Sequence, residues 1–491
     1  MALGKSSTMP GEICTLQIGQ FANYIGTHFW NAQESSFCFA DNSEAKIDHD
    51  VLFREGSTPK GQFTYTPRLV SVGLKGSLGG LKAEGVLYQA NSENTSEPLW
   101  DGKIDICQHD SFQKNQFQED LDQLEHQYEN SAHGSGAPKI PLGKTYRLEK
   151  VVKHWSDYLR PHLHPKSILI ANTYLSDDVD TVFSSFAAGT ELFKKEVGED
   201  LCERVRYIVE ECDSLQGFHM LGDSIHGFSG LYAETLKYIG EEYSNKHVLS
   251  FPCASILPNY DTSQRDLHLL NTFLTYYHAL EVGSVTLCPL NMWSTWNHLD
   301  IPLSFDNVDI QTPLLFHESA IMALAMDTAT LSYRVKNPRM SLFDLPHFSN
   351  SRWTAIEFSA YQTGDISFGK VIFPSFKEAN ITSRISLFRQ GSAAIPDFLS
   401  DYHNLSRNSL LQTLSQPWKL KTPFPGIIPK NSDIYPLGSF VSSVGLQESL
   451  AVLTEFIGSG SDRIFRRHLR SSMELDEWNE ILSDMRNLFC F

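Results

Sequence analysis

The hydrophobic pattern at the start of the chain predicts a buried strand that leads into a helix. In residues 12–18 apolar side chains occur on both alternating faces, which is typical of a strand covered on both sides. Gly19 follows, and then Phe21, Ile25 and Phe29 recur every four residues, the period of one helix face. The chain therefore begins with a strand–glycine–helix unit.

The same order of strand, turn and helix recurs later. Residues 68–74 have a strand pattern and precede a turn rich in glycine and serine, and residues 201–255 predict helix, strand, small-residue loop, helix and strand in succession. Repeated units of this kind imply a largely parallel sheet covered by helices on both faces. In such sheets ligands bind at the loops that follow the C-terminal ends of the strands. Here those loops are residues 19–20, 73–80 and 223–230.

The rest of the chain is less regular. A polar stretch with few aliphatic residues predicts an exposed insertion containing one short helix, alternating aromatic runs at 351–386 predict a mixed α+β region, and helix patterns return after residue 446. The expected division is an α/β domain at residues 1–330 with a polar insertion at about 91–141, a second α+β domain at 331–440 and C-terminal helices at 441–491.

Composition narrows the class of protein. The 491 residues carry 58 acidic and 40 basic side chains, a formal charge of −18, so a nucleic acid is not an expected partner. No apolar run reaches the roughly 18–20 residues that span a bilayer, and the first ten residues lack the features of a targeting signal. The eight cysteines form no CxxC pair. We therefore expect a soluble intracellular protein with reduced thiols.

The loop from Asp223 to Gly230 is the richest candidate for chemistry. Small residues between a strand and a helix leave backbone N–H groups open to a phosphate, whereas the alternative is a tight turn with an N-cap. No Gly-Lys-Ser/Thr follows, so a Walker motif is excluded. Gly227 and Ser229 come near the G-x-S-x-G elbow of hydrolases, but the last glycine is displaced by one residue. The spacing leaves the phosphate site and the structural turn open and disfavours a serine hydrolase.

Two further polar clusters favour structural roles. The histidines of KHWSDYLRPHLHP have no acidic or cysteine partner at a ligand-like spacing, so surface or capping positions are expected and no metal site is predicted; they are His154, His162 and His164. A basic stretch on a predicted helix favours a solvated face over contact with anionic lipid; it contains Arg466, Arg467 and Arg470.

Several segments resemble tubulins. Gly19, Gln20, Asn23 and Gly26 reproduce the G-Q-x-x-N-x-x-G pattern with which tubulins begin their first helix. Further tubulin-like segments follow in the tubulin order: YTPRLVSVGLKGS, ECDSLQGFHM, RIFRRHL and EWNEILSDMRNL. A second set of segments is more specific: DVLFREG, YTPRL, LKGSLGGLKAEG, RPHLHPKS and EECDSLQGF. On these segments the chain is identified as a member of the Misato family, tubulin-like proteins associated with mitochondrial distribution and morphology.

The resemblance implies a tubulin/FtsZ-like α/β fold with an altered nucleotide site. Where tubulins carry the acidic pair that helps to hold Mg²⁺, this chain has Gly73 and Lys75, and bulky side chains enter the glycine-rich phosphate loop. In tubulins an acidic residue from the neighbouring subunit supports hydrolysis, and the nearest segment here offers Asp344 and His347. The residues expected to remain of a degenerate nucleotide site are Gly19, Gln20, Gly227, Ser229, Gly230 and Asn291.

The function that the resemblance implies is therefore that of a non-enzymatic interaction protein. It would support mitochondrial partitioning, inheritance, distribution and morphology from the cytoplasm and the cytosolic face of the mitochondrion. The expected partners are proteins, tubulin or its folding machinery among them, with peripheral contact to the outer membrane. The resemblance leaves residual GTP binding open and implies no other cofactor. The alternative is a GTP-binding, polymerising GTPase that uses the same residues.

Overall fold

The computed structural model describes most of the chain. It describes residues 11–37, 46–57, 63–81, 113–130, 146–257, 260–295, 298–303, 307–336, 340–349, 351–362, 367–373, 381–390, 408–415, 418, 423–428 and 434–489. The predicted polar insertion lies outside these residues except for the segment that contains α2 (Gln116–Asn130), a helix of 15 residues and thus longer than the short one expected.

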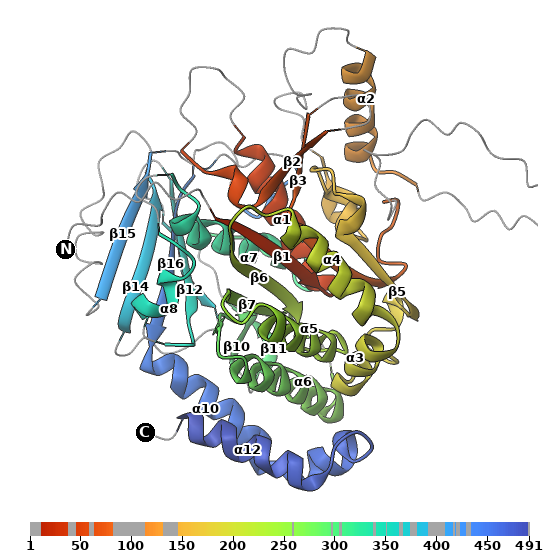
Figure 1. Cartoon of the computed structure of the whole chain (residues 1–491), viewed down its shortest axis with the longest axis vertical. Helices are drawn as coiled ribbons and strands as arrows, with labels where there is room; N and C mark the ends of the chain where they lie inside the picture. The colour runs from red at the N-terminus through yellow and green to blue at the C-terminus, as the bar shows by residue number, and fades with distance from the viewer. Residues whose placement is uncertain are drawn as a thin grey trace, which may run out of the picture.

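A parallel sheet forms the centre of the first half (Figure 1). Its strands lie in the order β5 (Ile168–Leu175), β4 (Leu69–Lys75), β1 (Glu12–Ile18), β6 (Leu215–Asp223), β7 (His247–Ala254) and β8 (Val285–Leu287), and β9 (Leu290–Asn291) also pairs with β7. β1, β6 and β7 are buried along their whole length, as strands covered on both faces must be. This confirms the predicted parallel sheet, and β1 has the predicted bounds.

The strand order places a switch point between β1 and β6. From β1 the chain moves outward to β4 and β5, and it then returns to the other side of β1 with β6 and β7. The loops after β1 and β6 therefore diverge to opposite sides of the sheet, which is where α/β sheets of this kind open a crevice for ligands. Both loops begin helices: α1 (Gln20–Ser35) follows β1, and α5 (Phe228–Glu242) follows β6.

Further helices and two hairpins complete this part of the molecule. α4 (Gly198–Glu210) contacts β4 and β1, and α3 (Phe186–Leu192) and α6 (Thr262–Glu281) both pack against α5. The two antiparallel pairs are β2 (Phe53–Ser57) with β3 (Phe63–Pro67) and β10 (Trp293–Thr295) with β11 (His298–Pro302).

A second, mixed sheet follows in sequence, as the alternating aromatic runs predict. Its order is β13 (Ser367–Phe373), β12 (Ala355–Gln362), β16 (Ile434–Ser443), β14 (Ile381–Arg389) and β15 (Asn408–Leu414), and only the β14–β15 pair is parallel. α7 (Leu315–Thr330) is buried on all sides from Phe316 onward because it packs against α1 on one side and against β12, β14 and β16 on the other. It is followed by α8 (Asp344–Ser349). The domain boundaries at 330 and 440 stay predictions.

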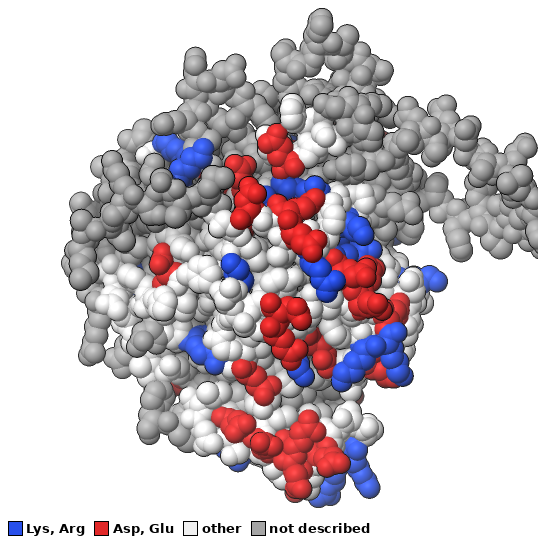
Figure 2. All heavy atoms as spheres, viewed as in Figure 1, with Lys and Arg blue, Asp and Glu red and all other residues white. Residues whose placement is uncertain are grey.

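The C-terminal helices pack against α6. They are α10 (Val444–Ser459), α11 (Ser461–Ile464) and α12 (Leu475–Phe489), and the Trp478 ring of α12 contacts Phe273 of α6. Acidic side chains gather over these helices on the face shown in Figure 2, in keeping with the negative charge of the chain. In the part of the chain described, no helix combines the length and the apolar character needed to cross a membrane.

Candidate functional site

The N-terminus of α1 is capped by a carboxylate from the neighbouring strand. Asp223, the last residue of β6, accepts hydrogen bonds from the backbone N–H groups of Phe21 at 3.0 Å and Ala22 at 2.7 Å. These are among the free N–H groups that a helix beginning at such a loop would offer to a phosphate. The Asp223 side chain thus takes the position of a bound anion.

Gly19 makes this approach possible. Its φ of +121° lies in the region that side chains rarely adopt, and a Cβ atom there would lie 2.4 Å from Asp223 Cγ. The glycine of the predicted first loop is therefore required by the intramolecular cap. Gln20 begins α1 and is half-buried.

Asp223 is buried, and no described basic side chain pairs with it. Burial raises the pKa of its carboxyl from 3.8 to about 7, although the backbone N–H groups of Ala22, Phe21 and Gln20 act in the opposite direction. Its exposed fraction is 4%. Much of the electrostatic support for the carboxylate therefore comes from the helix N-terminus.

The loop after β6 uses its backbone donors within the protein. The N–H of Gly227 donates to the Phe183 carbonyl at 2.8 Å, and the N–H of Ser224 donates to the Cys253 carbonyl at 2.9 Å. Turn bonds within the loop take up two more, those of Ser229 and Gly230. The loop is buried except at His226, which is partly exposed. Its backbone therefore has the hydrogen bonds of a packed turn.

The glycines of this loop allow two helices to approach closely. A Cβ atom at Gly230 would lie 2.0 Å from the Phe186 carbonyl oxygen, at the start of α3, and one at Gly227 would lie 2.8 Å from the Phe183 carbonyl. The side chain of Asn271 on α6 also joins this loop to the segment before α3, because its amide donates to the Ser184 and Ile225 carbonyls at 2.8 and 2.9 Å. Close contacts with Phe183, just before α3, and with Phe186, at its start, thus account for both glycines.

The remaining predicted residues lie on the same sheet. Asn291 ends β9, is fully buried and donates from Nδ2 to the Tyr276 hydroxyl at 3.1 Å. Gly73 is buried near the end of β4, whereas Lys75 ends that strand with an exposed side chain. The topology therefore brings Gly19, Gln20, Gly227, Ser229, Gly230 and Asn291 to the C-terminal edge of the sheet, as a nucleotide site requires; whether they bind a nucleotide stays a prediction.

The other polar motifs have structural contacts. The Ser229 hydroxyl is buried and donates to the His226 carbonyl at 2.6 Å, which fits a helix start and no hydrolase nucleophile. His164 accepts from the Lys166 N–H at 3.1 Å, a capping contact of the predicted kind. Arg466 lies 3.8 Å from Asp462 on an exposed surface.

Some predicted positions are exposed, and some lie outside the description. Asp344 and His347 are exposed on α8. The five described cysteines are free thiols, and they are Cys14, Cys202, Cys212, Cys253 and Cys288. Cys38, Cys107 and Cys490 lie outside the described residues.

Sequence reasoning missed two arrangements at this edge. It placed Asp223 in the loop without recognising it as the cap of α1, although an acidic residue at the end of a strand beside a glycine-led helix is a usable signal. It also missed a group of three side chains, Asp180, His226 and His268, whose potential ligand atoms lie within 4.8 Å of one another. Their separations of 46 and 42 residues along the chain match no short motif.

Comparison with known proteins defines the class first. Residues 146–335 match the family model of the tubulin domain, and residues 11–123 match that of the Misato segment II tubulin-like domain. Together with the parallel sheet and its switch point, these matches make the chain a tubulin-like protein of α/β fold.

The relatives then define the family. The chain is 35% identical to protein misato homolog 1 of Danio rerio over 68% of this chain and 60% of that protein, and 29% identical to the Mus musculus homolog over 97% of both. It is 34% identical to protein misato of Drosophila melanogaster over 67% of this chain and 61% of that protein. The chain belongs to the Misato family.

Proposed function

We propose that this chain is a tubulin-like interaction protein that supports the distribution, inheritance and morphology of mitochondria without turning over GTP. The proposed lack of GTP turnover rests on the Asp223 side chain at the N-terminus of α1. A triphosphate at the switch point would have to displace this side chain, because it occupies N–H groups of the helix start that a phosphate would use. The proposed mitochondrial role rests on the family resemblance.

The loop after β6 supports the same proposal. Phosphate loops bind through unobstructed backbone N–H groups, whereas Gly227 and Ser224 donate theirs to protein carbonyls and Ile225 and Phe228 are buried beside them. Lys75, with Gly73 before it, replaces the acidic pair expected to hold magnesium, and a lysine supplies no oxygen ligand. The chain keeps the tubulin-like sheet, but its loop after β6 is packed within the protein. We infer that it binds proteins through its surface.

The proposed partners and location follow from the family rather than from the site. We infer that the partners are proteins, with tubulin or its folding machinery as the first candidates. The chain would act in the cytoplasm and at the cytosolic face of the mitochondrion, in peripheral contact with the outer membrane. Depletion of the protein should then alter the mitochondrial network seen by fluorescence microscopy, and an unchanged network would contradict this half of the proposal.

Thermal unfolding with nucleotide tests the half that concerns GTP. A ligand at about 100 times its dissociation constant stabilises the native state by about 2.7 kcal/mol. We expect millimolar GTP with Mg²⁺ to leave the Tm of the purified full chain unchanged, and phosphate release to stay at the rate of a buffer control. A raised Tm together with steady phosphate release would instead establish the polymerising GTPase.

A further inference from the structure

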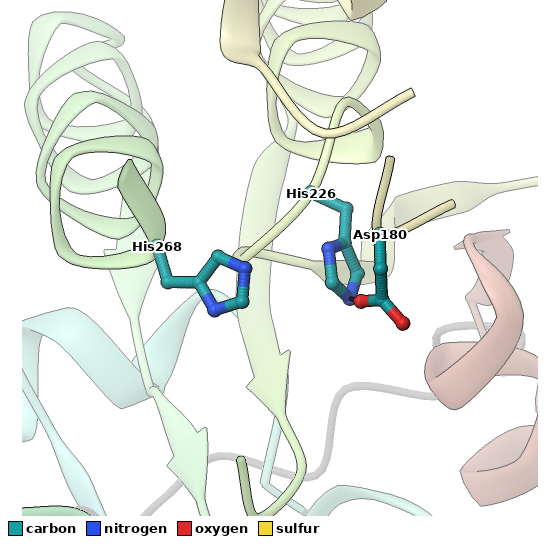
Figure 3. Close-up of side chains that lie close together, drawn as sticks. All are labelled: Asp180, His226 and His268. Carbon is teal, nitrogen blue, oxygen red and sulfur yellow. Dashed lines mark ion pairs between the residues drawn. The ribbon is translucent and has the colours of Figure 1, made fainter. Parts of the chain in front are cut away.

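Three side chains from distant parts of the sequence converge beside the loop after β6 (Figure 3). Asp180 lies in the turn after β5, His226 lies between β6 and α5, and His268 lies on α6. The His226 Nε2 atom is 3.5 Å from the Asp180 Oδ1 atom, and the two imidazole rings have centroids 5.2 Å apart. Among the described residues this is the group of histidine, cysteine and acidic side chains that is close enough to share an ion.

We propose that Asp180, His226 and His268 form a binding site for a transition-metal dication, with Zn²⁺ as the ion that this ligand set suits best. Two imidazole nitrogens and one carboxylate oxygen, with a water as the fourth ligand, are a combination that zinc accepts in a tetrahedral site. Magnesium is disfavoured because only one of the three ligands is a hard oxygen.

The spacing suits such an ion after a small movement. Ligand atoms about 2.0–2.1 Å from a tetrahedral zinc lie about 3.4 Å from each other. The Asp180–His226 pair already has this separation, and the 4.8 Å limit on the three atoms means that at most a modest closure is needed. Asp180 can make this movement, because its side chain is 53% exposed and the residue lies in a turn.

The histidines have the properties of metal ligands. His268 is buried and the His226 side chain is 12% exposed. His226 approaches Asp180 through Nε2, and the other nitrogen of its ring, Nδ1, has no hydrogen-bond partner among the described residues; the same holds for Nδ1 of His268. A ring nitrogen without a hydrogen-bond partner can bind an ion through its lone pair.

The surrounding contacts hold the three segments in place. Tyr260 donates its hydroxyl hydrogen bond to Asp180 Oδ1 at 3.0 Å, the kind of outer contact that orients a ligating carboxylate. Asn271, one helical turn after His268 on α6, donates to the Ile225 carbonyl next to His226 and to the Ser184 carbonyl in the segment after Asp180. The same asparagine therefore fixes all three ligand-bearing segments relative to one another.

Metal titration of the purified full chain tests the site. After chelator treatment, Co²⁺ should give a visible d–d band of a tetrahedral site that saturates at one ion per chain, and Zn²⁺ should abolish it by competition. Loss of an outer contact alone weakens metal sites by about 10–100-fold, so His226→Gln and His268→Gln should weaken Zn²⁺ binding at least as much. Asp180→Asn should weaken it by at least about 10-fold.

A matched control separates this site from adventitious binding. His278 also lies on α6 and pairs with Glu281 at 2.8 Å on a partly exposed surface, so His278→Gln should leave the titration unchanged. Asp180→Asn keeps the test valid if a histidine variant fails to fold, because Asp180 is half-exposed. The proposal is overturned if the wild-type chain binds no Co²⁺ or Zn²⁺ at micromolar concentration, or if the three variants bind as the wild type does. Equal weakening by His278→Gln would also overturn it.

Discussion

The two ends of α1 each meet a buried aspartate, and the two aspartates are stabilised in different ways. At the N-terminus, Asp223 accepts hydrogen bonds from backbone N–H groups, and none of the basic side chains that the structure describes lies beside it. Near the C-terminus, Gln33 donates to Asp327, which also binds Arg334 and Arg389, both at 2.8 Å. Burial opposes the charge of Asp327, but Arg389 and Arg334 together hold its pKa below the usual value.

The two aspartates have different roles: Asp223 caps a helix, whereas Asp327 connects separate parts of the fold. Asp327 lies on α7, Arg389 lies on β14, and Gln33 lies on α1, so this network ties the parallel sheet's first helix to the second sheet. Asp223 instead fills a place that an anion from outside could fill, because its partners are the free N–H groups of a helix. Asp223 thus caps one end of α1, and Asp327 ties the other end to the second sheet.

Removal of the Asp327 charge should have the largest effect. Asp327→Asn leaves Arg334 and Arg389 buried without a counter-charge, and such a break in a buried ion pair costs about 3–5 kcal/mol. We expect the free energy of unfolding in urea to fall by this amount. Asp462→Asn, which removes an exposed partner of Arg466, is the control and should change stability by less than about 1 kcal/mol. A loss at Asp327 no greater than that of the control would contradict the architectural role.

Removal of the Asp223 cap should have the next effect. Asp223→Ala leaves the N–H groups of Phe21 and Ala22 buried without an acceptor, at a cost of about 1–3 kcal/mol for each unsatisfied group, and we expect a loss of about 2–4 kcal/mol at pH 5. The measurement is urea unfolding followed by circular dichroism.

Asp261 supplies the comparison for this prediction. It caps the exposed start of α6 by accepting from the Gln264 N–H at 2.8 Å, so water can replace it in Asp261→Ala and the loss should be about 1 kcal/mol. If both substitutions cost the same, the α1 cap would be an ordinary surface cap and its resemblance to a bound anion would be lost.

The two regions were not equally predictable from sequence. The strand–glycine–helix unit at residues 12–29 is a local pattern, so β1 and α1 follow from it and from the apolar period. The loop at 223–230 was also located, since its small residues lie between a strand and a helix. Neither Asp223 as a cap nor Asp327 as a bridge was predicted. Phe21 lies 202 residues from Asp223, and Gln33 and Arg389 lie 294 and 62 residues from Asp327, so only the tertiary fold brings these partners together.

The glycines of the loop show a second limit. Gly227 and Gly230 fit both a phosphate loop and a tight helix–helix contact, and the sequence left the two interpretations open. What separates them is the position of Phe183 and Phe186, residues of a different segment whose carbonyls approach the glycines. A helix that packs on a glycine leaves no sequence pattern that differs from a helix that begins at a phosphate. The proposed metal ligands were missed for a different reason, since they are 46 and 42 residues apart along the chain.

The smallest expected effect is a difference between the two aspartates in how stability depends on pH. Burial raises the pKa of Asp223 from 3.8 to about 7, so its contribution to stability is fully present below about pH 4 and is lost as pH rises through 7. Asp327 has a lowered pKa, so its contribution is lost only as pH falls below about 4. Between pH 5 and 7 the contribution of Asp223 to stability should therefore fall, whereas that of Asp327 should stay constant.

Histidines titrate near pH 6.5 in the unfolded chain, whereas burial lowers the pKa of His28 and His219 to about 3 in the native chain. These groups therefore also make stability depend on pH in this interval and would obscure the wild-type profile alone. We therefore compare the wild type with Asp223→Asn, which cancels these groups; Cys253, which faces Asp223, stays neutral because burial raises its thiol pKa well above the usual value. The stability advantage of the wild type over Asp223→Asn should shrink by about 2 kcal/mol from pH 5 to 7, since each pH unit is worth about 1.4 kcal/mol while the native carboxyl holds a proton that the unfolded one has lost. The difference between the wild type and Asp327→Asn should stay constant over the same interval. An advantage at Asp223 that grows with pH would mean that the N–H groups of α1 outweigh burial, and that the carboxylate is bound there as a full anion.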